Sequence, residues 1–244
     1  MSSGPAVALE NVSKSFGEKP ILQDVSFQVG AGEALCILGR SGTGKSVTLK
    51  LIIALLKPEQ GRIWIEGDEI TRLHASDLSR VRRKMGFLFQ DAALFDSLTL
   101  YENLALPLFR LTSKSPAEVD IIIDRVLRDV GLGDDRQRMP SELSGGMRKR
   151  AGLARALVLE PRILLVDEPS SGLDRITASE IDELLLREKV EHRTTLIIVT
   201  HDVRGARRIA DRIAVLNQGR LIADGSVEEV QHSENEIARS LMSE

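Results

Sequence analysis

Cysteine, aromatic residues and long apolar runs are scarce in this sequence of 244 residues. The single cysteine, Cys36, rules out an internal disulfide framework and fits a reducing compartment. Aromatic residues make up only 3% of the chain, too few for a surface that stacks single-stranded bases. The densest apolar runs, residues 51–56 and 163–166, are far shorter than the ~20 residues of a membrane-spanning helix. Residues 1–5 lack the basic region and apolar stretch of a secretory signal, so we expect a soluble chain.

Neither sign of charge dominates the sequence. The 33 basic and 36 acidic residues give a formal net charge of −3, which argues against a chain that coats nucleic acid. We therefore expect no nucleic-acid partner. With 42% apolar and 28% charged residues, the composition is that of a globular protein able to bury a substantial core. The length allows one large domain or two small ones, and no internal repeat or low-complexity linker divides the chain.

Apolar strands and helices alternate along much of the chain. Continuous apolar runs at 34–38, 163–166 and 195–199 predict strands that are covered on both faces, and residues 213–216 predict another strand. Helical spacing predicts helices at 46–56, closed by Pro58, and at 144–158 and 175–191. This alternation indicates an α/β fold with a mostly parallel core sheet flanked by helices.

Two regions depart from this alternation. Polar and apolar residues alternate at 7–12 and 25–29, so we expect these early strands to form a separate N-terminal antiparallel layer. A further short strand is expected at 62–65. Between about residues 76 and 130, helical spacing predominates. Helices are expected there at 99–106 and at 116–130, the second capped by Ser115. This middle region is interpreted as an inserted helical subdomain.

A glycine-rich motif follows the strand at 34–38. The pattern G-x-x-x-x-G-K-[ST] is matched at every defined position, with a strand before it and a helix after it. Its glycines let the backbone turn so that N–H groups point inward and form an anion nest at a helix start. Lys45 brings a positive charge to the β- and γ-phosphates, and the Ser46 hydroxyl can ligate Mg²⁺. The predicted nucleoside triphosphate site comprises Gly39, Arg40, Ser41, Gly42, Thr43, Gly44, Lys45 and Ser46.

Two acidic residues follow the apolar strand at 163–166. Ligands of parallel sheets bind at the carboxyl ends of the strands, which is where these two side chains are expected. Asp167 is predicted to hold Mg²⁺ through its water shell. Glu168 is predicted to lie beside the γ-phosphate as a catalytic residue, where its carboxylate would activate or orient the attacking water.

The segment Leu-Ser-Gly-Gly-Met at 143–147 distinguishes this chain among phosphate-loop proteins. Ser144 is a good helix N-cap, and Gly145 and Gly146 expose backbone N–H groups to an anion at the positive helix end. The chain here resembles the nucleotide-binding subunits of ABC transporters, whose hallmark is an L-S-G-G signature at a helix start. The resemblance covers essentially the whole chain. It implies a single nucleotide-binding domain over residues 1–244, with a helical signature subdomain at approximately 90–160.

Further motifs of that family occur in the expected order. Gln90 stands at the place of the Q-loop glutamine, which serves the metal and the attacking water. Ser-Gly-Leu-Asp at 171–174 resembles the D-loop, whose Asp174 would join the opposing site, and His201 resembles the switch histidine at the γ-phosphate. Phe16 stands where the family stacks an aromatic ring on adenine. A phenylalanine that only packs the strand layer is the alternative interpretation.

The resemblance implies two composite ATP sites in a head-to-tail homodimer. In the family, the signature helix of one subunit reaches the γ-phosphate of ATP on the other, and Mg²⁺-dependent hydrolysis lets the dimer open. The implied partner is a polytopic membrane permease that docks near residues 90–107, at the cytoplasmic face of the inner membrane. Apolar residues of this segment either await that partner or pack the helical insertion: Leu94, Phe95, Leu98 and Leu100.

Residues 85–107 and 140–156 are similar to those of the Mla-type ATPases. These energise phospholipid movement between the inner and outer membranes of diderm bacteria, and related systems serve plastids and mycobacteria. Met147, where importers usually have glutamine, and the Ala-Leu-Phe-Asp stretch after Gln90 carry most of this similarity. It implies lipid-binding and small regulatory accessory subunits. Two alternatives stay open: an ABC transporter for another cargo, and a soluble ATPase of Fe–S assembly.

Several other side chains are interpreted as structural. Histidines in polar surroundings are expected on the surface: His74, His192 and His232. Trp64 and Cys36 are expected to pack rather than react. The cationic run at 148–150 is interpreted as a solvated helix face rather than a nucleic-acid site.

Overall fold

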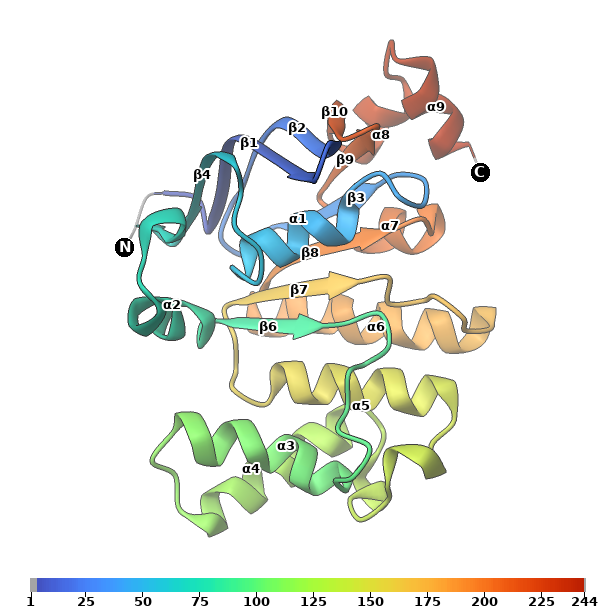
Figure 1. Ribbon diagram of the computed structural model, residues 1–244. Helices are drawn as coiled ribbons and strands as arrows, with labels where there is room; N and C mark the ends of the chain where they lie inside the picture. Colours follow the sequence, from blue (N-terminus) through green and yellow to red (C-terminus); the bar gives the residue numbers. More distant parts are fainter. Residues whose placement is uncertain (1–3, 244) are drawn as a thin grey trace.

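The computed structural model describes residues 4–243 and contains two β-sheets with helices packed around them (Figure 1). Five strands of the larger sheet are parallel, and a sixth runs antiparallel at one edge. The order across this sheet is β10-β9-β3-β8-β7-β6. Its strands are β3 (Ala34–Leu38), β6 (Met85–Leu88), β7 (Ile163–Asp167), β8 (Thr195–Thr200), β9 (Arg212–Asn217) and β10 (Arg220–Gly225). Every residue of β3, β7 and β8 is buried, as the continuous apolar runs predicted.

The second sheet is antiparallel and formed by the N-terminal part of the chain. Its order is β2-β1-β4-β5. The strands are β1 (Val7–Phe16), β2 (Lys19–Val29), β4 (Gln60–Ile65) and β5 (Asp68–Glu69). Burial alternates along β2, where Val25 and Phe27 are buried and Ser26 is exposed. The predicted antiparallel layer is confirmed, although β1 and β2 continue beyond the predicted ranges to the turn that joins them.

Helix α1 (Lys45–Ile52) packs against β7 and β8 and shares a hydrophobic core with the antiparallel sheet. The helix ends at Ile52, so the predicted end at residue 56, set by Pro58, is wrong. Ala54 takes a left-handed φ of 57°, and the amides of Leu55 and Leu56 bond back to the Lys50 carbonyl at 2.8 and 3.1 Å. These hydrogen bonds satisfy the Lys50 carbonyl in the last turn, so the helix ends before the chain reaches Pro58.

A layer of three helices has a hydrophobic core of its own: α3 (Leu100–Leu111), α4 (Pro116–Asp129) and α5 (Gly145–Leu157). Figure 1 shows this layer beyond β6, the edge strand of the parallel sheet. Ser115 caps α4 by accepting a hydrogen bond from the Glu118 amide, as predicted. The start of the insertion at about residue 76 is wrong, however. After α2 (Ala75–Arg82), the chain returns to the parallel sheet as β6, which pairs with β7.

The other face of the parallel sheet is covered by α6 (Arg175–His192), α7 (Val203–Ile209), α8 (Val227–Gln231) and α9 (Glu236–Met242). Helix α6 was predicted, whereas strand β10 and the short helices α7 to α9 were not. Three single turns of 3-10 helix complete the described elements: Ile70–Arg72, Gly133–Asp135 and Pro140–Glu142.

The remaining structural expectations concern single residues and the membrane. The three histidines named above are exposed, and Cys36 is buried, as expected. Within residues 4–243, no helix is both long enough and apolar enough to cross a bilayer. The prediction that no secretory signal is present rests partly on residues 1–3, which lie outside the described residues.

Candidate functional site

The phosphate loop connects β3 to α1 and depends on its glycines. Gly42 and Gly44 have φ values of +79° and +107°, which other residues rarely adopt. A Cβ atom at Gly39 would lie 2.4 Å from the Leu216 carbonyl oxygen, and one at Gly44 would lie 2.6 Å from a Leu22 methyl carbon. Gly44 also begins α1 without a side-chain cap from any described residue. The first amides of the helix are therefore available to an anion.

Lys45 is buried at the centre of this loop. Its Nζ donates hydrogen bonds to the Gly39 and Arg40 carbonyl oxygens at 2.7 and 3.2 Å, and lies 3.3 Å from Oε1 of Glu168. A buried ammonium group needs such partners, because burial without them is costly. The lysine charge is thereby held against the phosphate loop, and its contact with the phosphates stays a prediction.

The carboxyl end of β7 brings Asp167 to the start of α1. Oδ1 of Asp167 accepts a hydrogen bond from the Ser46 hydroxyl at 2.8 Å. Burial raises the pKa of Asp167 and the nearby Glu168 charge adds to the shift, while the Ser46 hydrogen bond opposes it. The donor set of adjacent hydroxyl and carboxylate oxygens suits Mg²⁺, which prefers hard oxygen ligands. Ser46 and Asp167 therefore fit the predicted metal.

Glu168 contacts both the phosphate loop and the end of β8. Its backbone φ of 47° is left-handed, which is unusual for a residue with a side chain. Its amide donates to the Val199 carbonyl at 2.9 Å. Oε2 lies 2.8 Å from Nδ1 of His201, while Oε1 faces Lys45. The carboxylate thus stands between two groups that can carry positive charge.

These residues surround a pocket of about 630 Å³, a volume suited to a small-molecule ligand. Nine of its lining residues were predicted from the sequence: Arg40, Ser41, Gly42, Gly44, Lys45, Ser46, Gln90, Glu168 and His201. Four lining residues were not assigned individual roles: Lys19, Ile21, Val47 and Ser171. Gly39 and Thr43 belong to the phosphate loop but do not line the pocket. The Thr43 hydroxyl donates a hydrogen bond to the Arg40 carbonyl oxygen at 2.9 Å.

Phe16 does not line this pocket. It ends β1 with 51% of its surface exposed, and Nζ of Lys14 lies 5.5 Å from its ring centroid. Lys19 and Ile21, beyond the turn on β2, line the pocket instead. The alternative in which Phe16 only packs the strand layer is wrong, because the residue is half exposed. Stacking on adenine stays a prediction.

The signature residues and Asp174 also lie outside this pocket. Ser144 caps α5 and accepts a hydrogen bond from the Met147 amide at 3.3 Å, as predicted. Asp174 caps α6 through the amides of Ile176 and Thr177. The two helix starts are neighbours, because a Cβ atom at Gly146 would lie 2.4 Å from Cγ2 of Thr177.

Sequence reasoning missed Lys149. The run at 148–150 was interpreted as a solvated face, but Lys149 is buried at 6% exposure. Its Nζ donates a hydrogen bond to the Glu168 carbonyl oxygen at 2.9 Å. Burial lowers the pKa of Lys149, and the charges of Asp91, Asp167 and Glu168 oppose that shift. The solvated-face interpretation is therefore wrong for this residue, and only the apposition of α5 and β7 reveals it.

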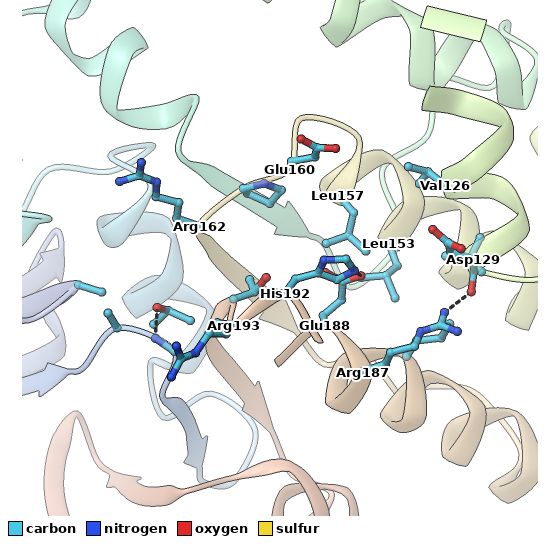
Figure 2. Close-up of a pocket in the computed structure, with 18 of the residues that line it drawn as sticks. Val126, Asp129, Leu153, Leu157, Glu160, Arg162, Arg187, Glu188, His192 and Arg193 are labelled. Atoms are coloured by element: carbon cyan, nitrogen blue, oxygen red, sulfur yellow. Dashed lines mark hydrogen bonds and ion pairs between the residues drawn. The ribbon is translucent and has the colours of Figure 1, made fainter. Parts of the chain in front are cut away.

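A second pocket, of about 580 Å³, lies at the opposite end of the parallel strands (Figure 2). It is lined by residues just before β7 and β8, by apolar side chains of α4 to α6, and by four arginines and four acidic residues. Two of these arginines are paired, Arg125 with Glu160 at 2.5 Å and Arg162 with Glu66 at 3.4 Å. With its charges balanced in this way, the second pocket lacks the positive excess that a triphosphate requires.

Comparison with known proteins identifies the family. The sequence matches the family profile described as ABC transporter over residues 22–171. The chain belongs to the ABC transporter family. A probable ribonucleotide transport ATP-binding protein (mkl) of Mycobacterium leprae is 44% identical, over 99% of this chain and 70% of that protein. A methionine import ATP-binding protein (MetN 1) of Bacillus cereus is 40% identical, over 92% of this chain and 66% of that protein.

Solved ABC cassettes share the fold as well. A dimeric ATP-binding cassette bound to ADP and Pi superimposes with a TM-score of 0.84, at 35% identity, covering 90% of this chain and 98% of that one. The cbiO1 subunit of the Clostridium perfringens cbiONQ transporter complex superimposes with a TM-score of 0.83, at 26% identity, covering 98% and 99%. The predicted fold class is confirmed. This ABC protein is an ATPase subunit of a transporter, and ATP is its ligand.

Proposed function

We propose that the chain powers a membrane transporter that moves phospholipid between the inner and outer membranes. The observation that carries the catalytic part is the convergence of Lys45, Glu168 and His201 on one pocket beside the phosphate loop. The similarity of residues 85–107 and 140–156 to the Mla-type ATPases supports the cargo. We further propose that residues 1–244 act as one nucleotide-binding domain, with the α3–α5 layer as the helical subdomain near 90–160.

The contacts around Glu168 support a sequence of roles in hydrolysis. Lys45 and the loop amides would bind the β- and γ-phosphates, and this would draw the Lys45 charge away from the Glu168 carboxylate. Freed from that ion pair, Glu168 would accept a hydrogen bond from the attacking water and orient it. His201 would hold the other carboxylate oxygen in place and contact the γ-phosphate.

Mg²⁺ is proposed as the cofactor. Ser46, Asp167 and Gln90 would hold it, directly or through water, since the first two supply adjacent oxygens and Gln90 lines the same pocket. When bound, the ion would neutralise phosphate charge. The protein's part is to fix the Ser46 and Asp167 oxygens against each other at the end of β7.

A head-to-tail homodimer would complete each site. Ser144, Gly145, Gly146 and Asp174 lie outside their own chain's pocket, at two neighbouring helix starts. Ser144, Gly145 and Asp174 are exposed, whereas Gly146 is buried against Thr177. Helix starts bind anions, so the signature residues are suited to the γ-phosphate of ATP held by a second copy. The dimeric state of a structural neighbour supports this arrangement.

The Gln90 segment is proposed to dock on a short cytoplasmic helix of the permease. Its apolar side chains divide between the two roles that the sequence left open. Leu100 is fully buried in the helical core and Leu94 packs against that core, whereas 51% of the Phe95 surface is exposed. Phe95 is therefore the docking candidate, which would place the subunit peripherally at the cytoplasmic face of the inner membrane.

Substitution of Glu168 tests the catalytic proposal. Glu168→Gln in the permease-containing complex is expected to retain ATP binding, lower turnover on the order of 100-fold or more, and favour a closed ATP-bound dimer. Turnover is measured as phosphate release and dimer closure by chemical crosslinking. Wild-type turnover in this variant would refute the assigned role.

Purification of the complex tests the cargo. We expect a polytopic membrane subunit with bound phospholipid, identified by mass spectrometry, and possible accessory lipid-binding subunits would appear in the same sample. The printed names of the relatives favour a second candidate, an importer of ribonucleotides or methionine. Recovery of such a substrate, and no lipid, would replace the phospholipid proposal. A soluble scaffold in place of a membrane subunit would instead indicate Fe–S assembly.

A further inference from the structure

We propose that Lys149 is a positioning residue that holds the main chain of Glu168 and thereby aims its carboxylate at the site of hydrolysis. This inference rests on the proposed role of Glu168 and extends it to a residue of the signature helix. Lys149 lies on α5, one turn beyond Gly146, with 6% of its surface exposed. Its Nζ donates to the carbonyl oxygen of Glu168 at 2.9 Å.

The Glu168 backbone needs such an anchor because its conformation is unfavourable by itself. A left-handed φ of 47° places Cβ close to the following carbonyl, and a residue with a side chain adopts it only when its surroundings impose it. On one side, the Glu168 amide is fixed by the Val199 carbonyl at 2.9 Å. On the other side, Lys149 fixes the carbonyl. Together the two bonds set the direction in which the carboxylate leaves the backbone.

The charge of Lys149 is also better explained by this role than by packing. Its position on α5 is apolar enough that burial lowers the pKa of the ammonium group, so an aliphatic side chain would be the cheaper occupant. The charges of three acidic groups on two segments oppose this shift: Asp91 after β6, and Asp167 and Glu168 at the end of β7. Lys149 therefore links the signature helix to the metal-binding and catalytic strand ends of its own chain.

Loss of this link is expected to affect the chemical step and leave nucleotide capture intact. Lys149 does not line the ATP pocket, so binding contacts remain when it is replaced. A carboxylate that is misplaced by about 1 Å can lose on the order of 10- to 100-fold in rate. We therefore expect a fall in kcat of that size, with KM for ATP changed by no more than about 2-fold.

The first experiment compares two replacements of Lys149 in the permease-containing complex. Lys149→Met keeps the side-chain length but removes the donor, and should show the loss of kcat. Lys149→Gln retains an N–H donor for the Glu168 carbonyl, and should recover most of it. The matched control is Lys189→Met on α6, because Nζ of Lys189 also donates to a main-chain carbonyl, that of Ile209, at 3.0 Å. The control should lose similar thermal stability without loss of kcat.

The second experiment is a double-mutant cycle with Glu168. If Lys149 acts through Glu168, Lys149→Met should cause no further loss of residual turnover in the Glu168→Gln background. ATP-driven dimer formation should also remain in the double variant. Equal fold-losses in both backgrounds, a rise in KM instead of a fall in kcat, or failure of Gln to rescue would overturn the inference. Full turnover by the Glu168→Gln single variant would overturn the proposed function. If that variant is inactive and the Lys149→Met single variant has normal turnover, only the inference about Lys149 is overturned.

Discussion

Lys45 and Glu168 form a pair at 3.3 Å between two nearly buried side chains. Taking both charges out of water is costly, and the pair gains back only part of that cost. A triphosphate would offer Lys45 a stronger anionic partner, and we propose that nucleotide binding breaks the pair. At the residue scale, the ion pair of Lys45 and Glu168 is therefore a contact that bound ATP would replace.

Replacement of Lys45 tests this exchange directly. Lys45→Ala removes the charge that meets the β- and γ-phosphates, while His201 still faces the Glu168 carboxylate at 2.8 Å. We expect ATP affinity to fall on the order of 10-fold or more, because a charge-assisted contact is lost. Titration with a fluorescent ATP analogue measures the Kd. Unchanged affinity would count against the placement of the phosphates in this loop.

Asp182 offers a test that depends on pH. Burial raises the pKa of this α6 carboxyl from 3.8 to about 6, with the charge of Asp202 contributing and Arg208 opposing. The folded state therefore binds a proton that the unfolded state lacks between about pH 4 and 6, so stability decreases as pH rises through that window and the full penalty applies above it.

Asp182→Asn should remove this penalty and stabilise the protein on the order of 2 kcal/mol at pH 7.5. The advantage should shrink toward pH 4.5, where the wild-type carboxyl is protonated in the fold. Urea unfolding at both pH values measures the difference. Glu183→Gln is the control, since that neighbouring acid is exposed and paired with Arg208 at 2.8 Å. An equal gain at both pH values would contradict the assignment.

At the scale of elements, α5 holds the segment that follows Gln90. Gly152 of α5 touches Ala92 so closely that an added Cβ would lie 2.8 Å from the Ala92 side chain and 3.0 Å from its Cα. Arg155, one turn later, donates to the Ala93 carbonyl oxygen. The same helix carries the signature at its start and Lys149 in its middle. Helix α5 therefore contacts both the segment after Gln90 and the end of β7.

Substitution of Gly152 should displace the Gln90 segment. Gly152→Ala forces Ala92 to move by several tenths of an ångström, because the contact is with backbone and not with a flexible side chain. We expect turnover to fall several-fold, with ATP binding close to wild type. Gly30→Ala is the control, since its Cβ would approach only the Glu33 side chain, whose carboxylate end can move away. Phosphate release and nucleotide titration distinguish these outcomes, and wild-type turnover in Gly152→Ala would contradict the prediction.

At the scale of the whole molecule, the residues of the proposed composite site are divided between two places in the described chain. The pocket around Lys45 contains the phosphate loop and the catalytic strand ends, whereas the signature and Asp174 lie at helix starts outside it. A second copy of the chain, turned head to tail, would bring these halves together twice.

A charge placed on the signature should separate folding from assembly. Gly145→Asp puts a carboxylate at the first position of α5, where the helix dipole stabilises it, so the Tm should stay unchanged or rise slightly. The same carboxylate would repel the γ-phosphate held by a second copy. We expect ATP binding to persist, while ATP-driven dimerisation and turnover fall on the order of 100-fold. Analytical ultracentrifugation with ATP checks this, and full turnover by a variant that stays monomeric would falsify the composite site.

Short-range interactions made much of this protein readable from its sequence. The phosphate loop needs positive φ at Gly42 and Gly44, and Ser115 and Ser144 cap helices through amides only three residues away. Such features involve neighbours in the chain, so residue type and spacing determine them. The continuous apolar runs of β3, β7 and β8 likewise determined a sheet that is buried on both faces.

Contacts between distant segments decided the rest. Residues 85–88 form a strand because β7 pairs with them, and Lys149 is buried because α5 lies against the end of that same strand. Phe16 pairs with Lys19 across the β1–β2 hairpin, and Lys19 rather than Phe16 lines the pocket. In each case, the local sequence allows more than one environment, and the packing energy of the whole fold selects among them.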